Sequence, residues 1–148
     1  MKIIAQNRKA YYNYSVEEEI EVGIILMGSE VKSIRSGKVN INDAHCLEIG
    51  GKIYLLNAYI SEYKGAILFT HEPRQNRQLL LHKKQIKKII GKIKTKGVTM
   101  VPLSLYFNDR NKVKVKIAIV KGKKLYDKKE SIKERDIERQ TRRDASGD

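Results

Sequence analysis

The chain has 148 residues, and 31 Lys and Arg against 17 Asp and Glu give it a formal net charge of +14. Its length suits one globular domain, and the single Cys46 excludes an internal disulfide. No N-terminal apolar run resembles a signal peptide or a membrane span, so we expect a soluble, cytoplasmic protein. Residues 1–120 hold +11 of the charge, which favours nucleic acid as the partner, with anionic membranes or simple solubility as the alternatives.

The first strand or strands are expected within residues 11–26, where apolar positions alternate with acidic ones and a glycine. The apolar positions are Val16, Ile20, Val22 and Ile24. A change of register near Glu18 and Glu19 interrupts the alternation. Residues 29–35 then predict a short helix, with Ser29 as its N-cap and Gly37 just beyond its end.

Residues 44–48 and 52–60 predict two strands joined by Gly50 and Gly51, which tolerate the positive φ of a tight turn. A helix is expected over residues 80–94, where isoleucines recur at helical spacing and lysines occupy another face. The apolar stripe consists of Ile86, Ile89, Ile90 and Ile93.

The clearest hairpin joins residues 101–107 to residues 112–120 through turn-forming residues. The alternating apolar side chains, expected on one face of each strand, are Val101, Leu103, Leu105 and Phe107, then Val113, Val115, Ile117 and Ile119. Antiparallel strands with inserted helices predict a mainly β fold, an oligonucleotide-binding-type closed barrel with flanking helices. Residues 1–120 would form this RNA-binding barrel domain, and residues 121–148 a charged C-terminal tail that is disordered in isolation.

Signatures of catalysis are poor, so we expect neither catalytic residues nor a cofactor. His45 and Cys46 are neighbours on a predicted strand and point to opposite faces, and Cys46 is expected in the core. His45, His71 and His82 lack the spacing of a zinc site, so no metal is expected. The glutamates of residues 17–21 could hold a divalent ion, which leaves a metal-dependent nuclease as an alternative to a solvated strand face.

Several features favour RNA binding when they are taken together. The loop of residues 71–77 carries Arg74 and Arg77, whose guanidinium groups match phosphate oxygens and guanine edges. Lysines in residues 83–96 and tyrosines in residues 11–14 would supply positive charge and base stacking. Each feature also has an explanation without RNA. The loop could simply be exposed, the lysines could solvate a helix face, and the tyrosines could be partly buried in the core.

Six segments match a known family, in the family's order. They are AQNRKAYYNY (residues 5–14), EEEIEVGIILMGSEVKSIRSGKVNINDAH (17–45), HEPRQNRQLLLHKKQI (71–86), GVTMVPLSLYF (97–107), KVKVKIAIVKGKKLYDKKE (112–130) and IKERD (132–136). On these segments the chain resembles the small protein B family, the bacterial tmRNA-binding factors of trans-translation. The resemblance implies an oligonucleotide-binding-type barrel with flanking helices, no cofactor and no catalytic activity.

The resemblance also implies a function and partners. The protein is expected to bind the tRNA-like domain of tmRNA and to accompany the alanyl-charged RNA to stalled ribosomes. Its tail would sense the empty mRNA channel and the rRNA of the decoding centre. Elongation factor Tu and alanyl-tRNA synthetase are expected partners through tmRNA, and the protein itself is expected to be a monomer. A generic RNA-binding barrel, such as a ribosomal or tRNA-binding accessory protein, explains the charge and fold equally well.

Candidate RNA-binding residues come from two arguments. By resemblance, Asn7, Glu21 and Leu80 match family positions implicated in RNA binding. Because Glu21 repels phosphate, we expect it to hydrogen-bond to bases or ribose or to hold a nearby cation, unless it is a structural strand residue. On chemical grounds the surface extends to Arg35, Lys38, Asn40, Arg77 and Lys83.

The first residues of the tail are the candidate ribosome contacts. They are Gly122, Lys123, Lys124, Tyr126, Asp127, Lys128 and Lys129. Gly122 would act as a pivot, the lysines would meet rRNA phosphates, and Tyr126 would stack on a base. Many relatives have arginine where Gln75 and Lys129 stand, and lysine lacks the bidentate fork of arginine. The tail is expected to become helical when it meets the walls of an empty mRNA channel.

Overall fold

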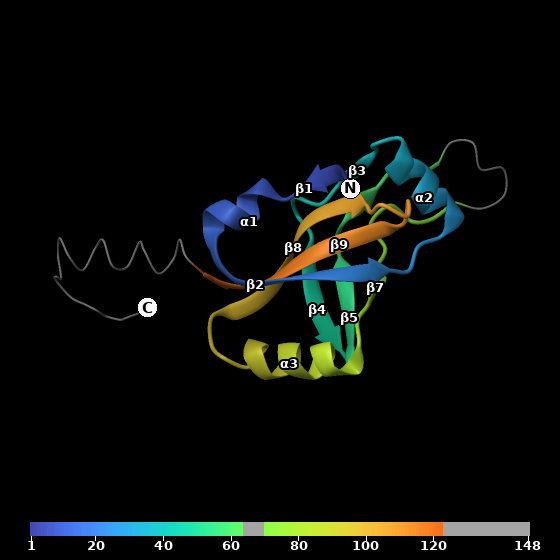
Figure 1. The fold of residues 1–148 in the computed structure, drawn as a ribbon. Coiled ribbons are helices and arrows are strands. Elements are labelled where there is room, and N and C mark those ends of the chain that lie inside the picture. The colour runs from blue at the N-terminus through green and yellow to red at the C-terminus, as the bar shows by residue number, and fades with distance from the viewer. Residues whose placement is uncertain (64–69, 123–148) are drawn as a thin grey trace.

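The computed structural model describes residues 1–63 and 70–122, which form a curled antiparallel sheet with three flanking helices (Figure 1). The seven-stranded sheet has the order β1-β8-β9-β2-β7-β5-β4, and β3 pairs with β6 separately. The strands are β1 (Lys2–Gln6), β2 (Tyr14–Ile24), β3 (Val39–Asn40), β4 (His45–Ile49), β5 (Lys52–Leu56), β6 (Tyr59–Ile60), β7 (Arg77–Leu80), β8 (Val98–Phe107) and β9 (Val113–Gly122). The predicted mainly β fold with helices is confirmed.

The helices lie at different borders of the sheet. They are α1 (Arg8–Asn13), α2 (Gly28–Arg35) and α3 (Lys83–Ile93). Helix α1 contacts β8 and β2, α2 contacts β6, and α3 contacts β8 and β9 near the ends of β4 and β5 (Figure 1). The sheet curls far enough for β4 to contact β8 as well. The strand pairings of residues 1–63 and 70–122 leave β1 and β4 as the two ends of the ladder, so full closure of the barrel stays a prediction.

The long hairpin of β8 and β9 forms as predicted, and the side chain of Asn108 organises its turn. The Asn108 Oδ1 atom accepts hydrogen bonds from the backbone N–H groups of Arg110 and Lys112, at 3.0 and 2.9 Å. Asn111 has a φ of 63°, a left-handed conformation that asparagine tolerates better than most residues. The connector therefore encodes the turn through local side-chain hydrogen bonds.

A bulge between Pro102 and Ser104 sends the apolar side chains of β8 to both faces of the sheet. Leu105 and Phe107 join the main core, whereas Val101 and Leu103 pack beneath α1 in a second apolar cluster. The prediction that these four side chains share one face is therefore wrong. The extra residue of a bulge shifts the two-residue repeat, and the sequence pattern did not indicate where this happens.

The second apolar cluster also buries residues of β9 that the sequence pattern placed on an exposed face. Ala118 and Val120 are buried against Ala10 of α1, on the face where the alternation of β9 predicted exposed lysines. The lysine-bearing part of this face comes earlier in the strand, at Lys114 and Lys116, which are half-buried. Strand β9 is therefore apolar on one face throughout, and its second face is apolar only where α1 covers it.

The first two elements of the chain were not predicted. Strand β1 pairs with β8, and the second half of α1, residues 11–13, falls in the range where a strand was expected. Helix α1 begins because Asn7 caps it: the Asn7 Oδ1 atom accepts a hydrogen bond from the Ala10 N–H at 3.3 Å. Strand β2 is correspondingly shorter than expected, and its bulge between Val16 and Glu18 confirms the predicted change of register.

The starts of the other helices differ from the prediction, and their sequence signals explain why. Met27, not Ser29, is the N-cap of α2, and the Glu30 carboxylate accepts the Met27 N–H at 2.7 Å. Helix α3 starts at Lys83 because the Gln85 side chain accepts the His82 N–H at 3.0 Å. Residues 80–82 thus precede the helix, and Leu80 belongs to β7.

Glycine turns agree with the prediction. Gly50 and Gly51 have φ values of 59° and 84° between β4 and β5, and Gly37, at 77°, follows the end of α2. The strand predicted over residues 52–60 is interrupted at Asn57, which has a φ of 62°. The interruption moves the chain from the large sheet into the small β3–β6 pair.

Candidate RNA-binding surface

One face of the sheet carries two of the three residues selected by family resemblance. We call it the outer face and define it by Glu19, Glu21 and Gly23 of β2, Leu80 of β7, Lys114 and Lys116 of β9, and Ser104 and Tyr106 of β8. The strand register places these residues on one side of the sheet, opposite the main core. Helix α1 and the second apolar cluster cover one end of the same side.

Glu21 is exposed on the outer face and accepts a hydrogen bond from the Tyr106 hydroxyl. Its direct cross-strand neighbour is Lys116, whose Nζ atom lies 3.7 Å from a carboxylate oxygen of Glu19. With Lys114, the face holds two acids and two lysines, so its local charge is balanced. A balanced face does not attract phosphate strongly, and the Glu21 carboxylate is suited to accept hydrogen bonds from bases or ribose.

Leu80 places an apolar side chain beside Glu21. It lies opposite Gly23 in the β2–β7 pairing, two residues along β2 from Glu21. A Cβ atom added to Gly23 would lie 3.4 Å from the Leu80 Cβ, so the leucine packs directly over the glycine. Leu80 is nevertheless 51% exposed. The structure therefore brings a carboxylate and an exposed apolar side chain together, as contact with a base or ribose requires.

Asn7 is buried and contributes to the outer face only indirectly, through helix α1. It is only 4% exposed, and its Nδ2 atom donates to the Pro102 carbonyl at 3.1 Å while its Oδ1 atom caps α1. Helix α1 in turn presents Tyr11 beside the outer face. Partial burial raises the pKa of Tyr11, and the nearby Glu19 carboxylate raises it further. In this structure Asn7 holds α1 in place, and direct contact with RNA is not available to its buried amide.

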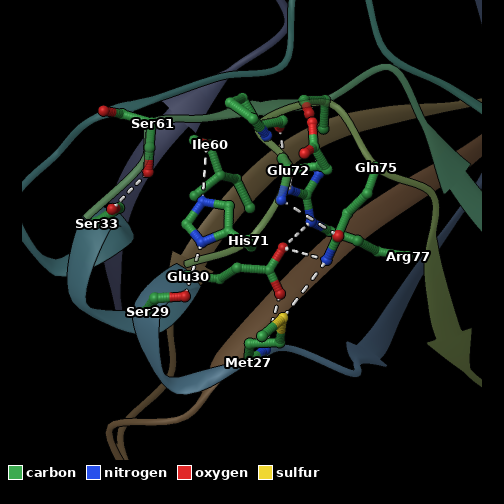
Figure 2. A network of polar contacts seen from close by, with 12 residues as sticks. Met27, Ser29, Glu30, Ser33, Ile60, Ser61, His71, Glu72, Gln75 and Arg77 are labelled. Atoms are coloured by element: carbon green, nitrogen blue, oxygen red, sulfur yellow. Dashed lines mark hydrogen bonds and ion pairs between the residues drawn. The ribbon is translucent and has the colours of Figure 1, made fainter. Parts of the chain in front are cut away.

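Arg77 lies in the interior, so the prediction that it sits on an exposed loop surface is wrong. Its side chain is 1% exposed and forms an ion pair with Glu30 of α2, whose side chain is equally buried (Figure 2). The guanidinium also donates to the carbonyls of Ala58, Pro73 and Glu72, at 2.9, 3.0 and 3.3 Å. Its donors are directed at the protein, which leaves Arg74 as the exposed arginine of the loop.

The buried ion pair belongs to a polar network that the sequence did not indicate. Gln75 donates to the Glu30 carboxylate at 3.2 Å, and the His71 ring lies 2.8 Å from both the Ser29 hydroxyl and the Ile60 carbonyl (Figure 2). A carbonyl only accepts, so the His71 Nε2 atom carries a hydrogen, and in the neutral ring Nδ1 accepts from the Ser29 hydroxyl. The network ties α2 to the segment of residues 71–77. The sequence features that could have indicated this network are an acidic residue on the short helix of residues 29–35 and a loop that carries two arginines and a histidine.

Three other predicted residues form a separate, exposed group where α2 leads into β3. The Arg35 guanidinium lies 5.7 Å from the centre of the Phe107 ring. The Asn40 Oδ1 atom accepts the Asn42 N–H at 2.8 Å, and the Lys38 side chain points to solvent. Lys83 is exposed at the start of α3, and this helix lies at another border of the sheet (Figure 1). The structure does not bring these residues to the outer face.

The tail begins beside α1. Gly122, the last described residue, pairs with Tyr14 at the start of β2, and its N–H donates to the Gly97 carbonyl at 3.3 Å. The other predicted tail residues lie outside the described residues: Lys123, Lys124, Tyr126, Asp127, Lys128 and Lys129. The attachment point of the tail is thus at the end of the outer face that α1 covers.

The described residues give no support to the nuclease alternative. In residues 1–63 and 70–122 no three His, Cys, Asp or Glu side chains are grouped as a metal site would need. Glu18 is paired with Lys88 and Lys92 of α3, and their hydrogen bonds lower its pKa. Cys46 is buried in the core as predicted, and burial raises the pKa of its thiol. No helix in the described part of the chain has the length and apolar character to span a membrane.

Comparisons with known proteins place the chain. A family model described as SmpB protein matches residues 4–147. The chain belongs to the SmpB family. It is 57% identical over 143 residues to an SsrA-binding protein of Wolbachia pipientis subsp. Culex pipiens, covering 97% of this chain and 96% of the relative. An SsrA-binding protein of Orientia tsutsugamushi (strain Ikeda) is 56% identical over 142 residues, covering 96% and 93% of the two chains.

A solved structure of the family agrees with the fold. It is described as "tmRNA-SmpB: a journey to the center of the bacterial ribosome", and the match has a TM-score of 0.69 at 40% sequence identity. The match covers 89% of this chain and 92% of the other. Family and fold are therefore supported over nearly the whole chain.

Proposed function

We propose that this protein binds the tRNA-like domain of tmRNA and accompanies it to stalled ribosomes for trans-translation, without catalytic activity of its own. The observation that carries the proposal is the identity of 55–57% with SsrA-binding proteins over 91–96% of their length. SsrA RNA is tmRNA, so the relatives carry the name of this activity. The partners in this proposal are tmRNA and the ribosome.

The outer face supports the proposal with suitable chemistry. Glu21 offers a carboxylate acceptor, Leu80 an apolar contact, and Tyr11 an exposed ring at the border. Such a set recognises bases and ribose at close range, while the +11 charge of residues 1–120 attracts the phosphate backbone from a distance. Arg35, Lys38, Asn40 and Lys83 remain proposed RNA contacts outside this face, and Asn7 acts through α1.

The tail has a separate role in this proposal. Gly122 acts as the pivot at the end of β9, and Lys123, Lys124, Tyr126, Asp127, Lys128 and Lys129 meet the rRNA of the decoding centre and the empty mRNA channel. Lysine at position 129 keeps the charge without the fork of arginine. Elongation factor Tu and alanyl-tRNA synthetase act through tmRNA, and the protein works as a cytoplasmic monomer.

A gel shift with the isolated tRNA-like domain, run beside ordinary tRNA across a salt series, tests RNA recognition. We expect tighter binding to the tRNA-like domain, with affinity falling steeply as salt rises because phosphate contacts release counterions. Glu21→Ala should reduce the preference, whereas Glu17→Ala, which removes the same charge from an exposed position of β2, should not. Equal affinity for both RNAs would favour the generic RNA-binding barrel, and RNA cleavage on addition of magnesium would favour the nuclease.

Removal of residues 123–148 tests the division of labour, because it leaves β9 complete to Gly122. We expect the truncated protein to keep nearly full affinity for the tRNA-like domain and to lose ribosome rescue in a translation assay programmed with a message lacking a stop codon. A large loss of affinity for the isolated RNA would contradict the proposed role of the tail.

A further inference from the structure

Tyr106 has an unusual position on the outer face. Although its side chain is on this face, the residue is only 1% exposed, so its ring is covered by its neighbours. Its hydroxyl donates a hydrogen bond to the Glu21 Oε2 atom. Strand β9 lies between β8 and β2, so two strand spacings, about 10 Å, separate the strands that carry the two residues. The two side chains therefore extend toward each other over β9, where the hydroxyl meets the carboxylate.

The register of the sheet shows which groups the ring passes. Tyr106 is paired with Lys114, and Glu21 is paired with Lys116, which is two residues further along β9. The tyrosine side chain thus runs diagonally across the strand between these lysines. Lys116 is 3.7 Å from Glu19, and no hydrogen bond joins it to Glu21. The tyrosine hydroxyl, not the opposite lysine, is the group that holds Glu21.

This hydrogen bond leaves part of the carboxylate available. Within the described residues, Tyr106 is the one side chain that donates to Glu21, and its hydrogen bond uses Oε2. Oε1 accepts no hydrogen bond from the described residues, and Glu21 as a whole is exposed. Burial raises the pKa of Tyr106, and the Glu21 carboxylate raises it further, so the hydroxyl keeps its proton and stays a donor at neutral pH. The contact therefore persists under the conditions of RNA binding.

We propose that Tyr106 is a positioning residue for RNA binding, because its hydrogen bond fixes the Glu21 carboxylate so that Oε1 accepts a hydrogen bond from the RNA. The donor on the RNA would be a base amino group or a ribose hydroxyl, since both are exposed in folded RNA. The inference rests on the proposed function and on Glu21 as a contact. A fixed side chain loses less conformational freedom on binding than a free glutamate does, which strengthens binding without adding a contact.

The test measures affinity for the isolated tRNA-like domain with four full-length proteins: the wild type, Tyr106→Phe, Glu21→Ala and the double variant. Tyr106→Phe keeps the buried ring and removes only the donor. We expect a loss of affinity of up to roughly tenfold, the size associated with ordering one flexible side chain on binding. In the Glu21→Ala background the same substitution should change affinity less than about twofold, because nothing remains to be positioned.

Two controls separate positioning from folding. Tyr63→Phe removes a hydroxyl from half-buried Tyr63, whose ring lies 5.2 Å from the Lys32 Nζ atom of α2, away from the outer face, and should leave affinity unchanged. Thermal unfolding of each variant shows whether the sheet is intact. The proposal is overturned if Tyr106→Phe weakens binding equally with and without Glu21, or if it binds as tightly as the wild type while Glu21→Ala does not. A wild type that fails to prefer the tRNA-like domain over ordinary tRNA would instead overturn the proposed function itself.

Discussion

Replacement of Arg77 by methionine should strongly destabilise the protein. Methionine is apolar and similar in length to arginine, and it lacks the guanidinium that pairs with Glu30. The side chains of Arg77 and Glu30 are each only 1% exposed. Loss of one partner of a buried ion pair costs about 3–5 kcal/mol, because the remaining charge is buried with neither a partner nor solvent around it. The carbonyls of Ala58, Glu72 and Pro73 also lose a donor. We expect a loss of about 3–5 kcal/mol in the free energy of unfolding.

Urea denaturation at neutral pH measures this loss as a lower midpoint with an unchanged slope, because the surface exposed on unfolding stays nearly the same. For a domain of this size it corresponds to a decrease of roughly 12–20 °C in Tm. Arg74→Met is the matched control in the same loop: the exposed Arg74 lies over the Tyr59 ring at 5.3 Å, and its removal should cost less than about 1 kcal/mol.

The double variant Arg77→Met/Glu30→Gln sharpens the test. Neutralising the acid that was left without its cation should recover about 1–2 kcal/mol relative to Arg77→Met alone. If Arg77→Met were no more destabilising than Arg74→Met, the reasoning that places Arg77 in a structural role would be refuted. The arginine would then be free for the RNA contact that the loop sequence first suggested.

Two further substitutions test other contacts. Asn7→Ala should lower the free energy of unfolding, measured in urea, by about 1–2 kcal/mol, because α1 loses its cap and the Pro102 carbonyl loses its donor. Asn7→Ser keeps a side chain that can cap the helix and should lose less. Equal losses in the two variants would contradict the capping role of Asn7. Glu18→Gln should cost less than about 1 kcal/mol at pH 7, and the cost should disappear as the pH falls well below 4.5. The lysines lower the folded pKa of Glu18, so its contribution is present above the ordinary value of 4.5 and disappears as the pH falls through the folded value. A cost that persists in acid would exclude the ion pairs as its source.

Local signals predicted much of the fold. The Gly50–Gly51 turn, the Asn108–Asn111 connector and the alternation of β9 each depend on neighbouring residues, so the sequence shows them directly. Helix α1 is short and was hidden by its tyrosines, which favour strands as readily as helices. The bulge in β8 was hidden as well, because it depends on how the strand meets α1 and β9.

The candidate site was predictable in part. Resemblance to the family selected Glu21 and Leu80, and the structure places both on the outer face. Charge alone selected Arg77, and it could not separate an arginine that binds RNA from one that holds a buried acid, because Glu30 lies 47 residues away in the chain. Tyr106 escaped notice for the same reason: its partner is 85 residues away, and nothing in its own segment distinguishes it from a core tyrosine.

The bulge in β8 has a consequence for how the molecule opens. It lets one strand supply two apolar clusters, so the β8–β9 hairpin is covered on the side of the main core and, near Val101 and Val120, on the side of α1 as well. A backbone amide covered on both sides exchanges its hydrogen only when both layers separate. We therefore expect the slowest hydrogen exchange of the protein in the part of this hairpin around Val101 and Ala118, with α1 and the β3–β6 pair opening far more often. The strand that carries Tyr106 would then be the part of the sheet that remains in register longest.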